Sequence, residues 1–295
     1  MTLPTTPDGK VIIPGYYPSI PAAIAGMALF GAVAVAFLWN FFRYGRQRYL
    51  LWVTVGAIMM ALGMAVRIPV HNDPTSIPTY SVSTLLTLLS PCAFIAQDYY
   101  VLPKLAEWAD ADDCLFLQPR LVGRIFLISD AVTFFLQMSG SGMGAVASMA
   151  SIGDKIALIG LIAQLVSFSV FIVLLVWFGF QVYVHGPQTR ADSSKRHYLT
   201  KWNAQVGKGW KRDWRAVYWA TLWTCLGLMV RCVFRVIEFS QGYDGQLRTT
   251  EWYFYVFDSL PLILAISVWV FIWPEKYFKE KLSQDAYALA TSMYP

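Results

Sequence analysis

The chain has 295 residues, of which 57% are hydrophobic and only 14% are charged, and its formal net charge is +5. Soluble domains carry roughly 25% charged residues, so this composition excludes an ordinary soluble protein and indicates a polytopic membrane protein. The small positive charge fits contact with anionic lipid on the inner face of a membrane, and it does not indicate a protein that binds nucleic acid.

Seven apolar segments are long enough to cross a bilayer, which takes about 20 residues of helix. They are predicted at about 20–42, 49–69, 80–102, 121–143, 155–184, 216–237 and 253–273. We therefore expect an all-α fold, a seven-transmembrane-helix bundle over residues 20–273. The flanking residues 1–19 and 274–295 are expected to form an extracytoplasmic N-terminal tail and a cytosolic C-terminal tail.

The distribution of Lys and Arg predicts the direction in which the chain crosses the membrane. The loops after the first, third and fifth spans, together with the C-terminal tail, hold 17 of these residues, whereas the N-terminal tail and the other three loops hold 4. Short loops rich in Lys and Arg stay in the cytosol. We therefore expect the N-terminus to lie outside and the C-terminus to lie in the cytosol.

Polar residues recur inside these apolar segments, where a charge costs at least about 2.5–3.5 kcal/mol at the centre of a helix. The second span ends at Arg67, and the fourth carries Asp130 and Gln137. The sixth and seventh spans each repeat the spacing i, i+4, i+7, which places three residues on one helical face. These residues are Arg231, Arg235 and Glu238 on the sixth span and Glu251, Tyr255 and Asp258 on the seventh.

Depths estimated at 1.5 Å per residue put most of these groups in the outer half of the bilayer, where we expect them to meet in one cavity. Two interpretations remain open. The charges can form an internal network of ion pairs, including Arg235 with Glu238, that fixes helix packing. They can also bind the headgroup of an amphiphile, and the two roles are compatible. In the third span, Pro91 is expected to free a backbone carbonyl.

Other seven-helix classes lack their signature residues in this chain. His71 is expected on the outer side, and His185 and His197 on the inner side, so the three cannot share a zinc site. The seventh span has no Lys for a retinal Schiff base, and no nucleotide-binding Walker motif occurs. We found no metal, nucleotide or nucleophile motif, and we therefore expect no cofactor, no metal and no enzymatic activity.

Motifs in five spans follow one another in a recognisable order. They are Gly63-x-x-x-Arg67, Ser90-Pro91 followed by Tyr99, Asp130 with Gln137-x-x-Gly140-x-Gly142, Gly160-Leu-Ile-Ala-Gln164, and Arg231-x-x-x-Arg235-x-x-Glu238 followed by Glu251, Tyr255 and Asp258. With these motifs the chain resembles the fungal lipid-translocating exporter family, also called RTA-like, along nearly all of its spans. It departs from the family at Met60 and Met64, where Glu and Tyr are common.

The resemblance implies a fungal, multi-pass protein of the plasma membrane, with an internal membrane as the alternative. It implies a translocator of lipids or amphiphiles, such as sphingoid long-chain bases or sterol-like toxic compounds, that contributes to stress resistance. A seven-span lipid sensor or regulator is one alternative, and a membrane enzyme or accessory export protein of a secondary-metabolite pathway is another. The expected partner is a membrane lipid or amphiphilic small molecule.

Overall fold

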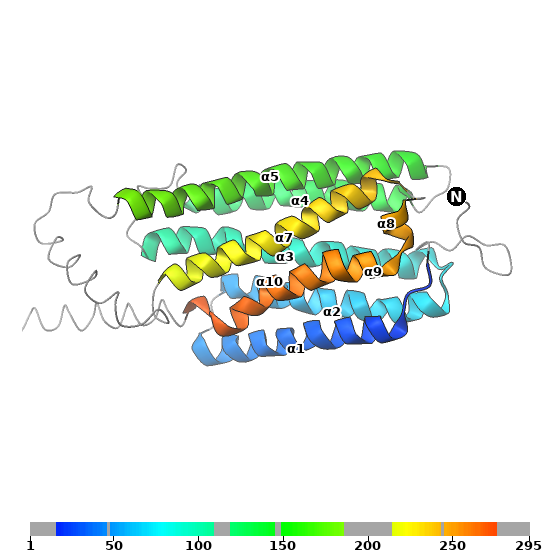
Figure 1. Ribbon diagram of the computed structural model, residues 1–295, viewed down its shortest axis with the longest axis horizontal. Helices are drawn as coiled ribbons and strands as arrows, with labels where there is room; N and C mark the ends of the chain where they lie inside the picture. Colours follow the sequence, from blue (N-terminus) through cyan, green and yellow to red (C-terminus); the bar gives the residue numbers. More distant parts are fainter. Residues whose placement is uncertain are drawn as a thin grey trace, which may run out of the picture.

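In a computed structural model, long helices lie side by side and form one elongated bundle (Figure 1). The structure describes residues 16–45, 48–108, 119–144, 149–185, 214–242 and 245–275. Within these ranges there is no strand, and seven helices are long and apolar enough to cross a membrane. The predicted all-α, seven-span fold is confirmed, and the chain is a multi-pass membrane protein.

Successive spans run in alternating directions (Figure 1). They are α1 (Ile20–Tyr44), α2 (Leu51–Asn72), α3 (Ile77–Trp108), α4 (Pro119–Gly144), α5 (Ala150–His185), α7 (Trp214–Ser240) and a seventh span of α9 (Glu251–Tyr253), η5 (Phe254–Ser259) and α10 (Leu260–Phe271). Two short helices, η1 (Arg48–Leu50) and α8 (Gln246–Thr249), lie at opposite ends. We call the end where α1 begins and α8 lies the N-side, and the end where α10 finishes the C-side.

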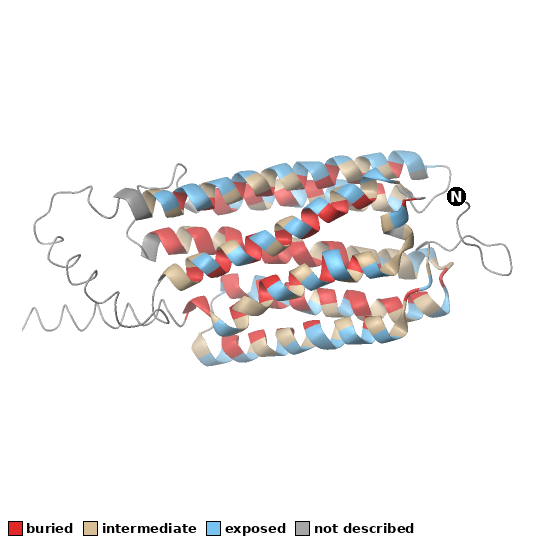
Figure 2. Ribbon diagram, in the orientation of Figure 1, coloured by how far each residue is buried: buried red, intermediate tan, exposed pale blue. Residues whose placement is uncertain are grey.

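Each spanning helix divides into a buried face and an exposed face that is itself apolar (Figure 2). Along α5, Phe171 and Leu175 are fully buried, whereas Val166, Val170 and Val173 are exposed. A helix on the surface of a soluble protein would instead carry polar residues on its exposed face. The apolar exposed faces therefore contact lipid, and the polar residues of the spans are left to the interior.

Small residues let neighbouring spans approach closely, as is common in membrane helix pairs. A Cβ added at Gly56 of α2 would lie 2.6 Å from the Phe94 ring of α3, and one added at Gly227 of α7 would lie 2.6 Å from Ala265 Cβ of α10. The hydroxyl of Ser90 also donates to the Gly56 carbonyl at 2.9 Å. These contacts fix how α2 sits on α3 and how α7 sits on α10.

The seventh span starts with a departure from α-helical geometry. Residues Phe254–Ser259 form a π-helix, and the N–H of Leu260 bonds to the carbonyl of Tyr255, five residues back. Pro261 follows, and proline has no N–H to donate into a regular α-helical ladder. The regular spacing assumed between Tyr255 and Asp258 therefore does not hold.

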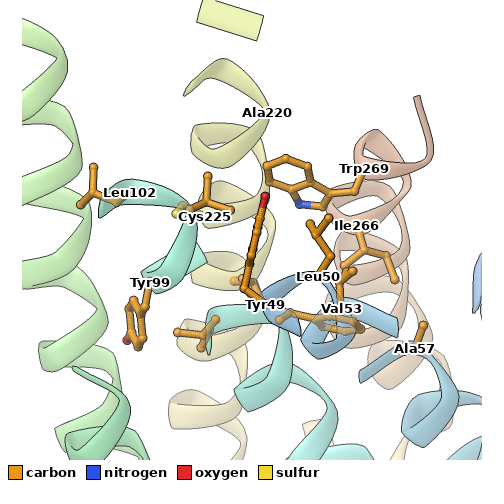
Figure 3. Close-up of a cluster of buried hydrophobic side chains, with 14 of the residues drawn as sticks. Tyr49, Leu50, Val53, Ala57, Tyr99, Leu102, Ala220, Cys225, Ile266 and Trp269 are labelled. Atoms are coloured by element: carbon orange, nitrogen blue, oxygen red, sulfur yellow. The ribbon is translucent and has the colours of Figure 1, made fainter. Parts of the chain in front are cut away.

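Figure 3 shows a group of packed hydrophobic side chains from the interior of the bundle. They come from η1, α2, α3, α7 and α10 and include Tyr49, Leu50, Val53, Tyr99, Leu102, Ala220, Cys225, Ile266 and Trp269. All of these are buried. This cluster closes the C-side half of the interior, and the main cavity lies nearer the N-side.

Candidate functional site

Two arginines of α7 share one fully buried carboxylate of η5. Arg231 Nη1 donates to Asp258 Oδ2 at 2.8 Å, and Arg235 Nε donates to Asp258 Oδ1 at 2.7 Å. Arg235 Nη1 also donates to Glu238 Oε2 at 2.9 Å, so the pair expected within the sixth span is confirmed. These four residues, which we call the ion network, hold two cations and two carboxylates, the balance that burial requires.

The ion network is tied to α3 through a backbone carbonyl. Arg231 Nη2 donates to the carbonyl oxygen of Thr87 at 2.7 Å. In a regular helix that oxygen would accept the N–H of residue 91, but Pro91 has none. The freed carbonyl predicted from the sequence is therefore present, and Arg231 uses it.

A second charged group lies at the N-side end of α2. Arg67 Nη2 donates to the Tyr16 hydroxyl at 2.6 Å and to Glu251 Oε1 at 3.3 Å. Burial raises the pKa of the Tyr16 phenol above its ordinary value, although the Arg67 charge opposes this shift. Tyr16 is therefore a neutral hydroxyl that accepts from Arg67 at neutral pH.

Residues 16–19, which we call the strap, are held against the N-side ends of the helices. The backbone N–H of Ser19 is 2.9 Å from both carboxylate oxygens of Glu251. His71 Nδ1 lies 2.7 Å from the carbonyl oxygen of Pro18. Two side chains from different spans therefore fasten the segment that precedes α1.

An aromatic ring links the strap region to the ion network. The Phe254 ring centroid lies 4.3 Å from the Arg67 guanidinium carbon and 5.4 Å from that of Arg235. The Tyr255 ring lies 5.5 Å from the same carbon of Arg67. Cation–π contacts of this kind are stronger where water is excluded. The π-helical turn thus presents neighbouring side chains to two arginines of different helices.

A cavity of about 80 Å³, the N-side cavity, lies beside these two groups. The charged residues of its wall are Arg67, Arg235, Glu238 and Asp154, and Tyr16 and Pro18 of the strap form part of it. The rest of the lining includes Tyr80, Ser83, Thr84, Thr87, Ser141, Phe239, Leu247, Thr250 and Phe254. A space of this volume holds several water-sized groups, at about 10–15 Å³ each.

The two residues predicted on the fourth span belong to neither charged group. Asp130 Oδ2 accepts from the Tyr99 hydroxyl at 2.9 Å, and Gln137 Nε2 donates to Gln164 Oε1 at 2.7 Å. Gln137 lines a second cavity of about 20 Å³ together with Arg231 and other residues. That volume is enough for about one water molecule.

The expectation that all nine residues meet in one cavity is therefore wrong. One group lies near the strap and consists of Arg67, Glu251 and Tyr255. The ion network is a second group, with Arg231, Arg235, Glu238 and Asp258. The third group faces α3 and α5 and consists of Asp130 and Gln137. Of the nine predicted residues, three line the N-side cavity, namely Arg67, Arg235 and Glu238. Depth alone could not separate these groups, because it does not give the rotation of each helix about its axis.

Several residues that contact the predicted site residues were not themselves predicted from the sequence to do so. Tyr99 and Gln164 stood in family motifs without a predicted contact, and Phe254 lies beside the predicted Tyr255. Tyr16 and Ser19 precede the first span, where hydropathy carries no signal of a contact with Glu251. Among the described residues, no group of three His, Cys, Asp or Glu side chains could hold a metal ion.

Comparison with known proteins gives one family and several relatives. The model of a family described as RTA1 like protein matches residues 53–281. The chain is 27% identical to Protein RTA1 of Saccharomyces cerevisiae over 283 residues, covering 88% of this chain and 84% of that protein. No solved structure matches the chain.

Two further yeast relatives have names that state a cargo. Protoporphyrin uptake protein 1 is 26% identical over 211 residues, covering 72% of this chain and 64% of that protein. Sphingoid long-chain base transporter RSB1 is 25% identical over 242 residues, covering 76% of this chain and 63% of that protein. The chain thus spans less than two thirds of the length of these two relatives.

Proposed function

The chain belongs to the RTA1 like protein family, and from this premise we propose that it translocates an amphiphile whose polar headgroup enters the N-side cavity. Two yeast relatives are named for sphingoid long-chain base transport and for protoporphyrin uptake, so membrane transport of lipid-like compounds is a family-level activity. We propose a cationic amphiphile such as a sphingoid long-chain base as the cargo of this chain, and the plasma membrane as its location.

The observation that carries the proposal is a polar cavity inside an otherwise apolar bundle. Charged side chains are costly within a membrane and mark binding sites or pathways more often than inert structure. Arg67, Arg235 and Glu238 all reach the cavity wall, next to a row of hydroxyl groups on α3. A volume of about 80 Å³ fits a headgroup of a few heavy atoms but not a long acyl chain. The chain of the amphiphile would therefore stay in the lipid beside the helices.

The charge of the wall favours a headgroup that carries an amine. Both oxygens of Asp258 are occupied by Arg231 and Arg235, whereas Glu238 lines the cavity and accepts from Arg235 through Oε2. An ammonium group in the cavity can pair with Glu238 while Arg235 keeps Asp258. The ammonium adds one positive charge to a network that is already balanced, and Asp154, which also lines the cavity, supplies a further carboxylate that can offset it.

The test is transbilayer movement of a labelled sphingoid base in liposomes that contain the purified protein. We expect wild-type protein to speed movement over empty liposomes and Glu238→Gln to slow it, since the variant lacks the carboxylate. Asp73→Asn is the matched control, because Asp73 is an exposed carboxylate that bonds Thr75 outside the cavity. Movement no faster with wild-type protein than in empty liposomes would overturn the proposal.

A further inference from the structure

Two buried carboxyl groups lie apart from the ion network and are in no ion pair with another described residue. Asp98 of α3 is 0% exposed and Asp130 of α4 is 3% exposed. Arg67, Arg231 and Arg235 form ion pairs with Glu251, Asp258 and Glu238, and none of these pairs includes Asp98 or Asp130. In each group the Oδ1 atom is buried and has no hydrogen-bond partner.

Within the part of the chain that the structure describes, the hydrogen-bond donors to these carboxyls are a phenol and a thiol, which are neutral groups. Asp130 Oδ2 accepts from the Tyr99 hydroxyl at 2.9 Å, and the thiols of Cys92 and Cys232 are close enough to interact with Asp130 electrostatically. An ionised carboxylate in such surroundings is costly, because no opposite charge compensates for the lost water. Asp258 is the reverse case, since it pairs with two guanidinium groups.

The environment of Asp98 is similar, on another face of α3. The Cys225 thiol of α7 donates to Asp98 Oδ2 at 3.7 Å, and the side-chain amide of the adjacent Gln97 is buried with neither polar atom bonded. Figure 3 shows Tyr99 and Cys225 within the packed cluster that surrounds this part of α3. Because α3 packs against both α4 and α7, two consecutive residues, Asp98 and Tyr99, connect to different helices.

A line of polar side chains runs from the N-side cavity towards Asp130. Arg235 lines both cavities, and the smaller one, with room for about one water, is also lined by Gln137 and Gln164. Gln137 donates to Gln164, whose Nε2 lies 3.6 Å from Cys92 Sγ. Asp130 is two helical turns from Gln137, or roughly 10 Å along α4.

From this geometry we propose that Asp130 and Asp98 are proton-binding sites through which movement of the amphiphile is coupled to protons. Each carboxylate takes up one proton to form the neutral acid and later returns it to water, and no other bond changes. A cationic headgroup entering the N-side cavity favours release of the proton from Asp130, since a nearby positive charge stabilises the carboxylate relative to the neutral acid. The coupling rests on the proposed function, whereas the proton sites themselves do not.

Infrared spectroscopy of the purified protein tests the proton sites without any transport. We expect a carboxylic-acid C=O band at neutral pH that shifts in heavy water, weakens in Asp130→Asn and in Asp98→Asn, and weakens further in the double variant. Tyr99→Phe should shift the band without removing it, because Asp130 then loses its hydrogen-bond donor. Asp73→Asn, at an exposed carboxylate, should leave the band unchanged. An acid band that is the same in all variants would overturn the proposal.

Liposomes with an imposed pH gradient test the coupling. We expect reversal of the gradient to change the rate of wild-type movement of a labelled sphingoid base several-fold, and a trapped pH-sensitive dye should report proton movement when the base is added. Asp130→Asn should move the base at the same rate in either gradient. If the wild-type rate does not change when the gradient is reversed, the coupling is overturned. If the protein does not move the base at all, the proposed function is overturned, and the infrared result remains valid.

Discussion

Asp258 joins the seventh span to α7, because each of its carboxylate oxygens accepts a hydrogen bond from an arginine of α7. Asp258→Asn keeps the shape of the side chain but leaves Arg231 and Arg235 with one compensating carboxylate. Removing one partner of a buried ion pair costs about 3–5 kcal/mol. We expect a clear fall in the thermal unfolding midpoint of the protein in detergent micelles.

Glu238→Gln is the matched comparison for that measurement. It also removes one carboxylate from the ion network, but Arg235 keeps its bond to Asp258, and Glu238 lies at the cavity wall. The midpoint should therefore fall less than in Asp258→Asn. Equal midpoints in the two variants would show that Asp258 does not have the central position that its contacts indicate.

Residue spacing predicted one of these contacts and could not predict the others. The Arg235–Glu238 pair follows from the i, i+3 geometry of a single helix. The freed carbonyl of Thr87 follows from Pro91, although its partner Arg231 does not. Pairs between helices, such as Arg231 with Asp258, depend on helix rotation and on the π-helical turn, and neither can be read from one sequence.

At the scale of elements, the strap is the segment whose release would open the N-side cavity. Glu251→Gln removes the negative charge that binds both Ser19 and Arg67. We expect a cysteine placed at Thr84 in the cavity wall to react faster with a water-soluble maleimide in this background. The native cysteines supply the background rate, measured in protein without the Thr84→Cys change. An unchanged rate would mean that Glu251 does not hold the cavity closed.

The contact between α7 and α10 depends on the absence of a side chain at Gly227. A Cβ there would lie 2.6 Å from Ala265 Cβ and 2.7 Å from the Pro261 carbonyl oxygen, so the helices must separate. We expect Gly227→Ala to lower stability by about 1–3 kcal/mol, as overpacking commonly does. Gly31→Ala is the control, since nothing lies within 4 Å of its Cβ position. Similar unfolding midpoints for the two variants would contradict this account.

Sequence patterns identify the membrane-spanning helices much better than they identify the π-helix. Hydropathy and length identify seven spans, because apolar stretches of this length have few other uses. The π-helix at Phe254–Ser259 leaves only an indirect trace, Pro261, and a proline at the start of a helix is common without any π-helix. The spacing rule on the seventh span therefore assumed a regular helix where the structure has a wider turn.

At the scale of the whole molecule, the arrangement of polar groups gives the bundle two unlike halves. The N-side half holds the ion network, the strap and the larger cavity, whereas aromatic and aliphatic side chains close the C-side half. The polar line that leads from the cavity runs towards Asp130, whereas Asp98 lies on another face of α3, beside Cys225 of the packed cluster. Such an asymmetric interior suits a protein that loads its cargo from one leaflet, so the orientation of the chain decides which leaflet that is.

We predict that the N-side faces out of the cell, because the segments expected from the sequence as cytosolic loops and tail carry 17 Lys and Arg residues, and those expected outside carry 4. An epitope at the N-terminus should then be reached by antibody in intact cells, and one at the C-terminus only after permeabilisation. In that orientation the proposed function predicts that the cavity takes up headgroups from the outer leaflet. The opposite staining pattern would place the same cavity at the cytosolic leaflet, and a cationic amphiphile would then have to load from inside the cell.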